Sequence, residues 1–340
     1  MPPKFTSSQV RLQYYIKIFF VFMYVLGIYI IIQMGTILTS KGDIDKIMAT
    51  LFFDTILRLI AFTKDDLSKV VDPVEMEIIY RHERSILRDA VVFMSFGNLT
   101  LIGWTMVPII MGRRVLPMAA WYPYDSNLSP YYELSYFHQM SAMVIIAYSN
   151  NFLDVMVNSI ARQLCCQFEL LRRRLERFTD AEGDDEEQYE RLVYYIKYQK
   201  MLYESVEDTG NIICPMAFAQ FSVSGIVLCS TLYRMSTQNG ILSAIPDITY
   251  LLTMTCQVFV YCWNNNELNY QSTVLYQGPY ACEWTKQPAK FRRALLLLMT
   301  SCQRPILLQA GGIIPITMQT FMTIVKSSYT FFTMVNQVMD

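Results

Sequence analysis

Seven apolar runs, each long enough to cross a membrane as a helix, restrict what this chain can fold into. A helix of about 20 residues spans a hydrocarbon core of about 30 Å. The run at 46–62 is the weakest, because Asp54 and Arg58 lie inside it. Their spacing places both on one helix face, where their charges neutralise each other. The predicted spans are residues 16–38, 46–62, 90–111, 133–157, 211–233, 244–263 and 314–338.

Basic residues are distributed unequally between the segments that join these spans. If the N-terminus lies inside the cell, 21 lysines and arginines fall in inner segments and five in outer ones. The positive-inside rule then places the N-terminus in the cytoplasm and the C-terminus outside. A composition of 53% hydrophobic residues with a net charge of -1 fits contact with lipid and argues against nucleic acid. We therefore predict an all-α polytopic membrane protein with an inside N-terminus.

The last span carries a largely polar stripe on one face. Its members follow spacings of three or four residues and fall within a sector of about 100°. Two explanations remain open. Small hydroxyls bond back to backbone carbonyls and let helices pack closely, or the stripe lines a water-filled pore. The stripe consists of Thr320, Thr323, Ser327, Thr330, Met334 and Gln337.

The segment from Arg162 to Asp208 has a helical apolar pattern that an acidic run at 180–187 interrupts. We predict that the fourth and fifth spans continue beyond the membrane into the cytoplasm and that the acidic run is a solvated turn, because it lacks the spacing of a calcium loop. Cys165 and Cys166 lie just inside the fourth span, where a packed pair is favoured over palmitoylation. No cysteine is expected in an outer loop, so no extracellular disulfide is predicted.

The sequence lacks the patterns of catalytic and metal sites. It has two histidines, His82 and His138, and no Cys/His ligand spacing, phosphate-binding glycine loop or Ser/His/Asp grouping. We therefore expect no enzyme activity, no metal and no cofactor.

Aromatic and sulfur-containing residues gather near the outer halves of several spans. Such side chains form a soft, adaptable wall that suits small volatile ligands with few hydrogen-bonding groups. The same residue types fill the interior of any membrane bundle, so packing is the competing explanation. The candidates are Phe52, Phe53, Trp104, Tyr136, Met140 and Met143.

Two motifs resemble signatures of the insect odorant receptor family. Residues 116–125, LPMAAWYPYD, resemble the family's outer-loop signature, and Gln303-Arg304-Pro305 with 310–312 resembles its C-terminal signature. The resemblance implies an odorant-gated, non-selective cation channel in the plasma membrane of a sensory neuron. It implies four subunits around a pore lined by the last span, with a cytoplasmic anchor domain. A chain of this length resembles an odorant-tuning subunit that works with a co-receptor.

The same resemblance assigns roles to individual positions. Trp104 matches the aromatic residue that caps the family's odorant pocket, with Gly97 and Thr100 on the same face, while Met334, Gln337 and Val338 match gate positions. Lys326 departs from the pattern. The resemblance also implies three regions: residues 1–157 with the odorant pocket, 158–313 with transmembrane helices 5 and 6 and the anchor segments, and 314–340 as the pore helix. A gustatory receptor channel and a metabotropic seven-helix receptor remain as alternatives.

Overall fold

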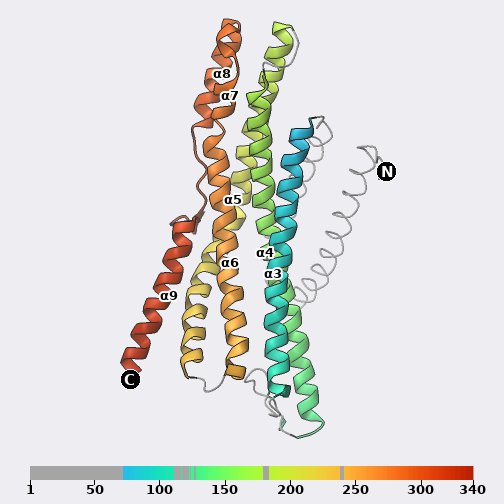
Figure 1. Ribbon diagram of the computed structural model, residues 1–340, viewed down its shortest axis with the longest axis vertical. Coiled ribbons are helices and arrows are strands. Elements are labelled where there is room, and N and C mark those ends of the chain that lie inside the picture. The colour runs from blue at the N-terminus through green and yellow to red at the C-terminus, as the bar shows by residue number, and fades with distance from the viewer. Residues whose placement is uncertain are drawn as a thin grey trace, which may run out of the picture.

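The computed structural model describes residues 72–110, 128–178, 184–237 and 241–339, together with positions 116, 122, 124 and 125. The predicted spans at 16–38 and 46–62 lie outside these residues, and so do Phe52 and Phe53. Four long helices run side by side along the long axis of the molecule (Figure 1). They are α3 (Pro73–Ile110), α4 (Tyr131–Glu176), α5 (Asp185–Thr237) and α6 (Ile241–Val274).

Helices α4 and α5 are much longer than a membrane is thick. They contain 46 and 53 residues, which at 1.5 Å per residue gives about 70 and 80 Å. Both helices therefore extend beyond the thickness of a membrane, and α4 ends at Glu176 and α5 begins at Asp185, next to the acidic run. That these extensions lie in the cytoplasm stays a prediction. Among the described residues, α3, α4 and α5 are long and apolar enough to be assigned as spans from length and composition.

The chain beyond α6 forms a compact end piece and a connecting segment. The helices α7 (Gln277–Ala281), η2 (Trp284–Lys286) and α8 (Ala289–Cys302) lie at the end of the bundle where α5 begins (Figure 1). After α8 the chain returns along the bundle to α9 (Met318–Met339), whose C-terminus lies at the opposite end.

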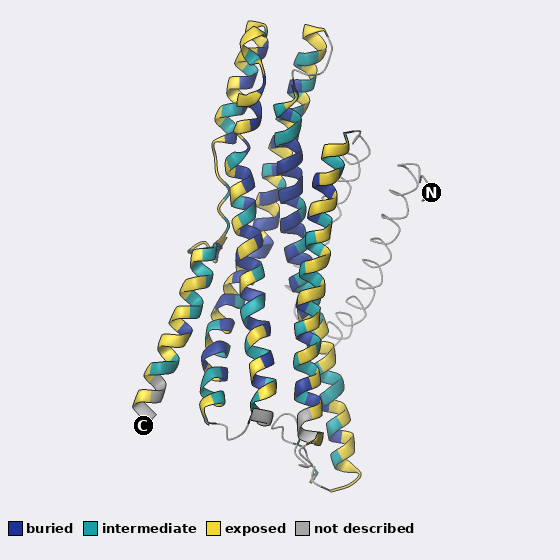
Figure 2. Cartoon of the chain, viewed as in Figure 1, coloured by how far each residue is buried: buried dark blue, intermediate teal, exposed yellow. Residues whose placement is uncertain are grey.

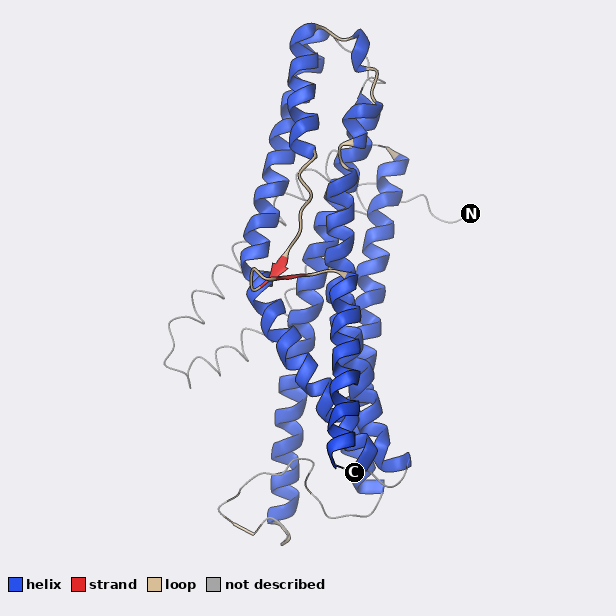
Figure 3. Ribbon diagram, turned by 90° about the vertical axis from the view of Figure 1, so that its left-hand side faces the viewer, coloured by secondary structure: helices blue, strands red, loops and turns tan. Residues whose placement is uncertain are grey.

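A short hairpin that the sequence did not predict precedes α9. Strands β1 (Gln309–Ala310) and β2 (Ile314–Pro315) pair antiparallel about midway along the bundle (Figure 3). Gly311 and Gly312 form its turn with positive φ, a conformation that favours glycine. The predicted start of the last span at residue 314 is wrong, because Ile314 and Pro315 form β2 and the helix begins at Met318.

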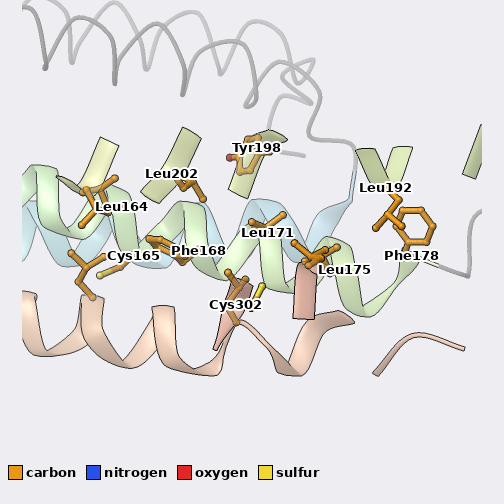
Figure 4. Packing of buried hydrophobic residues seen from close by; sticks show 14 of the residues in the cluster. Leu164, Cys165, Phe168, Leu171, Leu175, Phe178, Leu192, Tyr198, Leu202 and Cys302 are labelled. Carbon is orange, nitrogen blue, oxygen red and sulfur yellow. The ribbon is translucent and has the colours of Figure 1, made fainter. Parts of the chain in front are cut away.

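The main apolar core lies towards the end of the bundle that carries α7 and α8, where the second half of α4 meets α5, α7 and α8. This end is called the inner end and the opposite one the outer end, after the predicted topology. Figure 2 shows the buried residues gathered there, and Figure 4 shows Phe168, Leu171 and Cys302 within the cluster. Cys165 and Cys166 are both buried and free, which confirms the packed pair and leaves neither thiol accessible for a lipid.

A ladder of ion pairs, each called a rung, joins α3 to the second half of α4. Their residue numbers rise along α3 as they fall along α4, as antiparallel helices require. Three rungs have an acid on α3, whereas Glu169 provides the acid on α4 for Arg81 and His82. The rungs are Asp72–Arg177, Glu75–Arg174, Arg81/His82–Glu169 and Asp89–Arg162.

Candidate functional site

Trp104 lies near the outer end of α3 among groups from two other helices. Its ring meets that of Tyr250 on α6 edge to face, with the centroids 6.1 Å apart. The guanidinium carbon of Arg234, at the end of α5, lies 5.6 Å from the ring centroid. Arg234 also pairs with Asp247 at 3.3 Å, and the Asp247 side chain is only 2% exposed. Trp104 is therefore enclosed by an aromatic ring and a cation held in place by a buried acid.

Gly97 and Thr100 lie two turns and one turn before Trp104, and both make close interhelical contacts. A Cβ on Gly97 would lie 2.3 Å from Nδ2 of Asn151, so a larger residue there would push α3 away from α4. The hydroxyl of Thr100 lies 2.9 Å from that of Thr253 on α6. These two positions are contact points between helices.

Tyr136 ties the outer end of α4 to α3. Its hydroxyl donates a hydrogen bond of 2.7 Å to the backbone oxygen of Thr105, next to Trp104. Met140 and Met143 are half-buried further along α4. The structure thus brings Tyr136 to the neighbourhood of Trp104, and their shared role in a ligand site stays a prediction.

Sequence reasoning missed Arg234, Tyr250 and Asp247 as neighbours of Trp104. More than 120 residues separate Arg234 from Trp104 along the chain, so no local pattern connects them. The one available signal was Asp247, an acid inside a predicted span, which calls for a partner.

Two hollows lie on the α3, α4 and α6 side of the described chain, and neither is lined by a candidate ligand residue. The smaller lies between the three helices and has a polar wall that includes Asn158, Arg162 and Asn264. The larger is an open groove along the inner part of α3, where Arg81, His82 and Glu169 meet.

The polar stripe of α9 points away from the rest of the described chain. The hydroxyls of Thr323, Ser327 and Thr330 bond back to carbonyls of their own helix, with Thr323 donating to Gln319 at 2.9 Å and Ser327 to Thr323 at 2.7 Å. The hydroxyl of Thr320 donates to the carbonyl of Pro315 in β2. Thr323, Ser327, Thr330, Met334 and Gln337 are nevertheless exposed, and the side chain of Val338 is not described. Back-bonding is therefore present, but it does not serve packing against another described helix of this chain.

The opposite face of α9 packs on α5 and α6. Ser328 is buried, and Phe321 meets Phe259 of α6 with ring centroids 5.5 Å apart. Lys326 is exposed, and no ion pair links it to another residue in the described part of the chain.

Comparison with known proteins gives a consistent result. The model of the 7tm odorant receptor family matches residues 47–329. Odorant receptor 10 of Aedes albopictus is 21% identical over 328 residues, covering 88% of this chain and 86% of that protein. The insect olfactory receptor OR5 from Machilis hrabei superimposes with a TM-score of 0.67 at 17% identity, over 93% of this chain and 88% of that chain. Its complex with eugenol gives 0.70 at 16% identity, over 77% and 69%.

These comparisons establish both the fold and the family. The superpositions identify the fold as the multi-pass, all-helical membrane fold of that receptor. The family match covers well over half of the chain, and its members are receptors and not enzymes. The chain therefore belongs to the insect odorant receptor family.

Proposed function

We propose that this chain is the odorant-tuning subunit of a ligand-gated, non-selective cation channel. It spans the membrane seven times with a cytoplasmic N-terminus and an extracellular C-terminus. A small volatile ligand binds near Trp104, between α3, α4 and the outer ends of α5 and α6. Binding opens a pore that α9 lines together with the same helix of neighbouring subunits, and α7, α8 and the inner ends of α4 and α5 form the cytoplasmic anchor.

The exposed hydroxyl stripe of α9 is the observation that supports this function best. Lipid disfavours a row of polar groups, so such a face belongs against water or another polar surface. Thr323, Ser327 and Thr330 form that row over two turns, while Ser328 turns towards α5 and α6. A pore between several copies of α9 gives the row the water it requires.

The surroundings of Trp104 support a small ligand with a large apolar surface. Indole and phenol rings supply dispersion contacts, and the buried Nε1 of Trp104 has no partner among the described groups. An oxygen of the ligand can accept that hydrogen. The relative from Machilis hrabei is described in complex with eugenol, an aromatic volatile with oxygen acceptors.

Lys326 supports the involvement of a co-receptor. Four copies of this chain would place four ammonium groups at one level of the pore helix, and like charges there repel permeating cations. Co-receptor subunits without that lysine would reduce the repulsion. We therefore propose a hetero-oligomer, a tetramer as in the family.

Cysteine substitution along α9 tests the pore. In cells that also express the co-receptor, Ser327→Cys and Thr330→Cys should react with a water-soluble thiol reagent in open channels and block the current. Lys326→Cys should react slowly or without block, because position 326 lies to the side of the stripe. The unsubstituted chain reports the background from its own cysteines. Fast block at 326 with none at 327 or 330 would show that another face lines the pore.

Truncation of Trp104 tests the ligand site. Trp104→Ala removes an apolar contact worth about 2–3 kcal/mol, so the ligand concentration for half-maximal current should rise about 30- to 150-fold. Trp284→Ala is the matched control, because Trp284 is also half-buried but packs against the main apolar core at the other end of the bundle. Dose-response curves with unchanged midpoints for several ligands would exclude this pocket.

A further inference from the structure

An acidic side chain is buried where α4 faces α6, within the predicted fourth span. Asp154 is 4% exposed, and both of its carboxylate oxygens accept hydrogen bonds from α6. The hydroxyl of Tyr261 donates to Oδ1 at 3.0 Å, and the amide of Gln257 donates to Oδ2 at 2.5 Å. Asn150 of α4 adds a third donor at 3.3 Å. A carboxylate inside a membrane bundle is costly to bury, so its retention calls for a role.

Asp154 belongs to a row of polar contacts along the bundle. Asn264 donates to Asn158 at 3.0 Å one turn further in, and Thr100 meets Thr253 on the outer side. Between them Asn151 fills the space beside Gly97. The row thus extends from the turn before Trp104 on α3 towards the inner end of the bundle.

Tyr261 connects this row to the base of α9. Its hydroxyl reaches Asp154, while its ring belongs to an apolar cluster that includes Ala310 of β1 and Ile316 directly before α9. Phe321, in the first turn of α9, packs against the same cluster. The phenol ring of Tyr261 is 2% exposed, so it cannot turn without displacing its neighbours.

The hairpin before α9 is fixed on its other side by α5. The backbone N–H of Gly311 donates to the carbonyl of Cys214 at 3.2 Å, and Phe218 lies so close that a Cβ on Gly311 would be 2.8 Å from its ring. The base of α9 is therefore held between α5 and Tyr261. A change in the position of Tyr261 would therefore alter one of the contacts that hold the base of α9.

We infer that the hydrogen bond between Tyr261 and Asp154 positions the base of α9 and so sets the balance between the closed and open pore. This inference rests on the proposed channel function, but it concerns coupling and not the ligand site. Tyr261 and Asp154 are positioning residues, because neither belongs to the Trp104 site or to the stripe on α9. A packed element with two discrete arrangements can transmit a small displacement in this way.

A double-mutant cycle tests the inference. Tyr261→Phe removes the hydroxyl and keeps the ring, and Asp154→Leu keeps the branched shape of the acid and removes both acceptor oxygens. Channels with co-receptor are recorded without ligand and with a panel of alcohols, ketones, esters and eugenol, and currents are normalised to surface-labelled protein. Each substitution should change the ratio of ligand-free to maximal current about tenfold or more. The double variant should change it no more than the larger single effect.

Tyr198→Phe is the matched control. Tyr198 is also buried and donates to a side chain of α4, Gln167, at 2.5 Å, but it lies in the inner core far from α9. Its substitution should alter the surface level of the protein and leave the current ratio unchanged. If Asp154→Leu fails to reach the surface, Gln257→Met removes another donor to Asp154 and completes the cycle with Tyr261→Phe.

The outcomes separate this inference from the channel proposal. If the unsubstituted chain conducts but Tyr261→Phe behaves like Tyr198→Phe, the positioning role is wrong and the channel stands. If the effects of the substitutions at Tyr261 and Asp154 add in full in the double variant, the hydrogen bond between them is not the coupling contact. If the unsubstituted chain passes no current with any member of the panel, the channel function itself is wrong, and the inference falls with it.

Discussion

The outer and inner halves of α4 have opposite patterns of burial. In the outer half Ser135 and Gln139 are buried, whereas Phe137 is 72% exposed. In the inner half Phe168 and Leu171 are buried, and the arginines lie at the edges in ion pairs. One half has polar residues inside and apolar residues outside, and the other has the reverse. Since lipid and water favour opposite surfaces, the same helix passes from one solvent into the other.

Helix α5 shows the same change as α4. Ile226 on α5 and Ile146 on α4 are about 70% exposed in the outer half, where lipid would cover them. At the inner end the apolar side chains of α4, α5 and α8 form the main core, and the ladder of ion pairs joins α3 to α4. The inner end is thus stabilised like a water-soluble protein. From this contrast we expect the membrane boundary near Asp89 and Arg162, independently of the count of basic residues.

The largest expected effect separates two phenylalanines of α4. Phe168→Ala removes a ring that is 0% exposed and packs edge to face on Tyr203, so it should cost about 3–5 kcal/mol of stability. Phe137→Ala, at an exposed position of the same helix, should change stability by about 0.5 kcal/mol or less. Thermal unfolding of both variants in detergent measures the difference. Equal losses would break the comparison between the halves.

A charge placed on each half tests the solvent directly. Ile146→Lys puts an ammonium on the face assigned to lipid and should cost about 3 kcal/mol, seen as poor membrane insertion and low surface abundance. Tyr280→Lys, on the exposed side of α7, should leave both unchanged within about 0.5 kcal/mol. Good insertion of the Ile146 variant would move the membrane boundary.

Much of the inner half could be predicted from the sequence, and little of the outer site could. The spacing of Leu164, Phe168, Leu171 and Leu175 predicts a helix that continues beyond the membrane, because an apolar stripe is a local pattern. The hairpin before α9 has only two residues per strand, too few to give such a pattern. It depends on contacts with α5 that are distant along the chain.

Partners within the bundle were also beyond sequence reasoning. Asp154 and Tyr261 are more than 100 residues apart, and either could have met any other helix. The polar stripe of α9 could be read from spacing alone, but its two explanations could not be separated until the helices covering each face were known. Periodicity assigns residues to a face, and only the packing of helices determines what that face meets.

The smallest expected effect is on the stability of the fold at acid pH. It sharpens the contrast between the outer and inner halves, because ion pairs hold only the inner half of α3. Burial raises the pKa of Glu169, but the hydrogen bond from His82 and the charges of Arg81 and His82 outweigh burial and bring the pKa below its ordinary value of 4.5. A carboxylate with a lowered pKa in the folded state adds stability above its unfolded pKa and loses it as the pH falls through the folded pKa.

Glu169→Gln should therefore be less stable than the unsubstituted chain at neutral pH. It should also lose less stability on acidification below about pH 4.5, by at most about 1.4 kcal/mol per pH unit. Unfolding in detergent between neutral and acid pH measures this slope, with Glu186→Gln as control, because Glu186 pairs with Lys290 at an exposed position. Parallel curves for the Glu169 variant and the unsubstituted chain would show that this rung of the ladder adds nothing to the inner half.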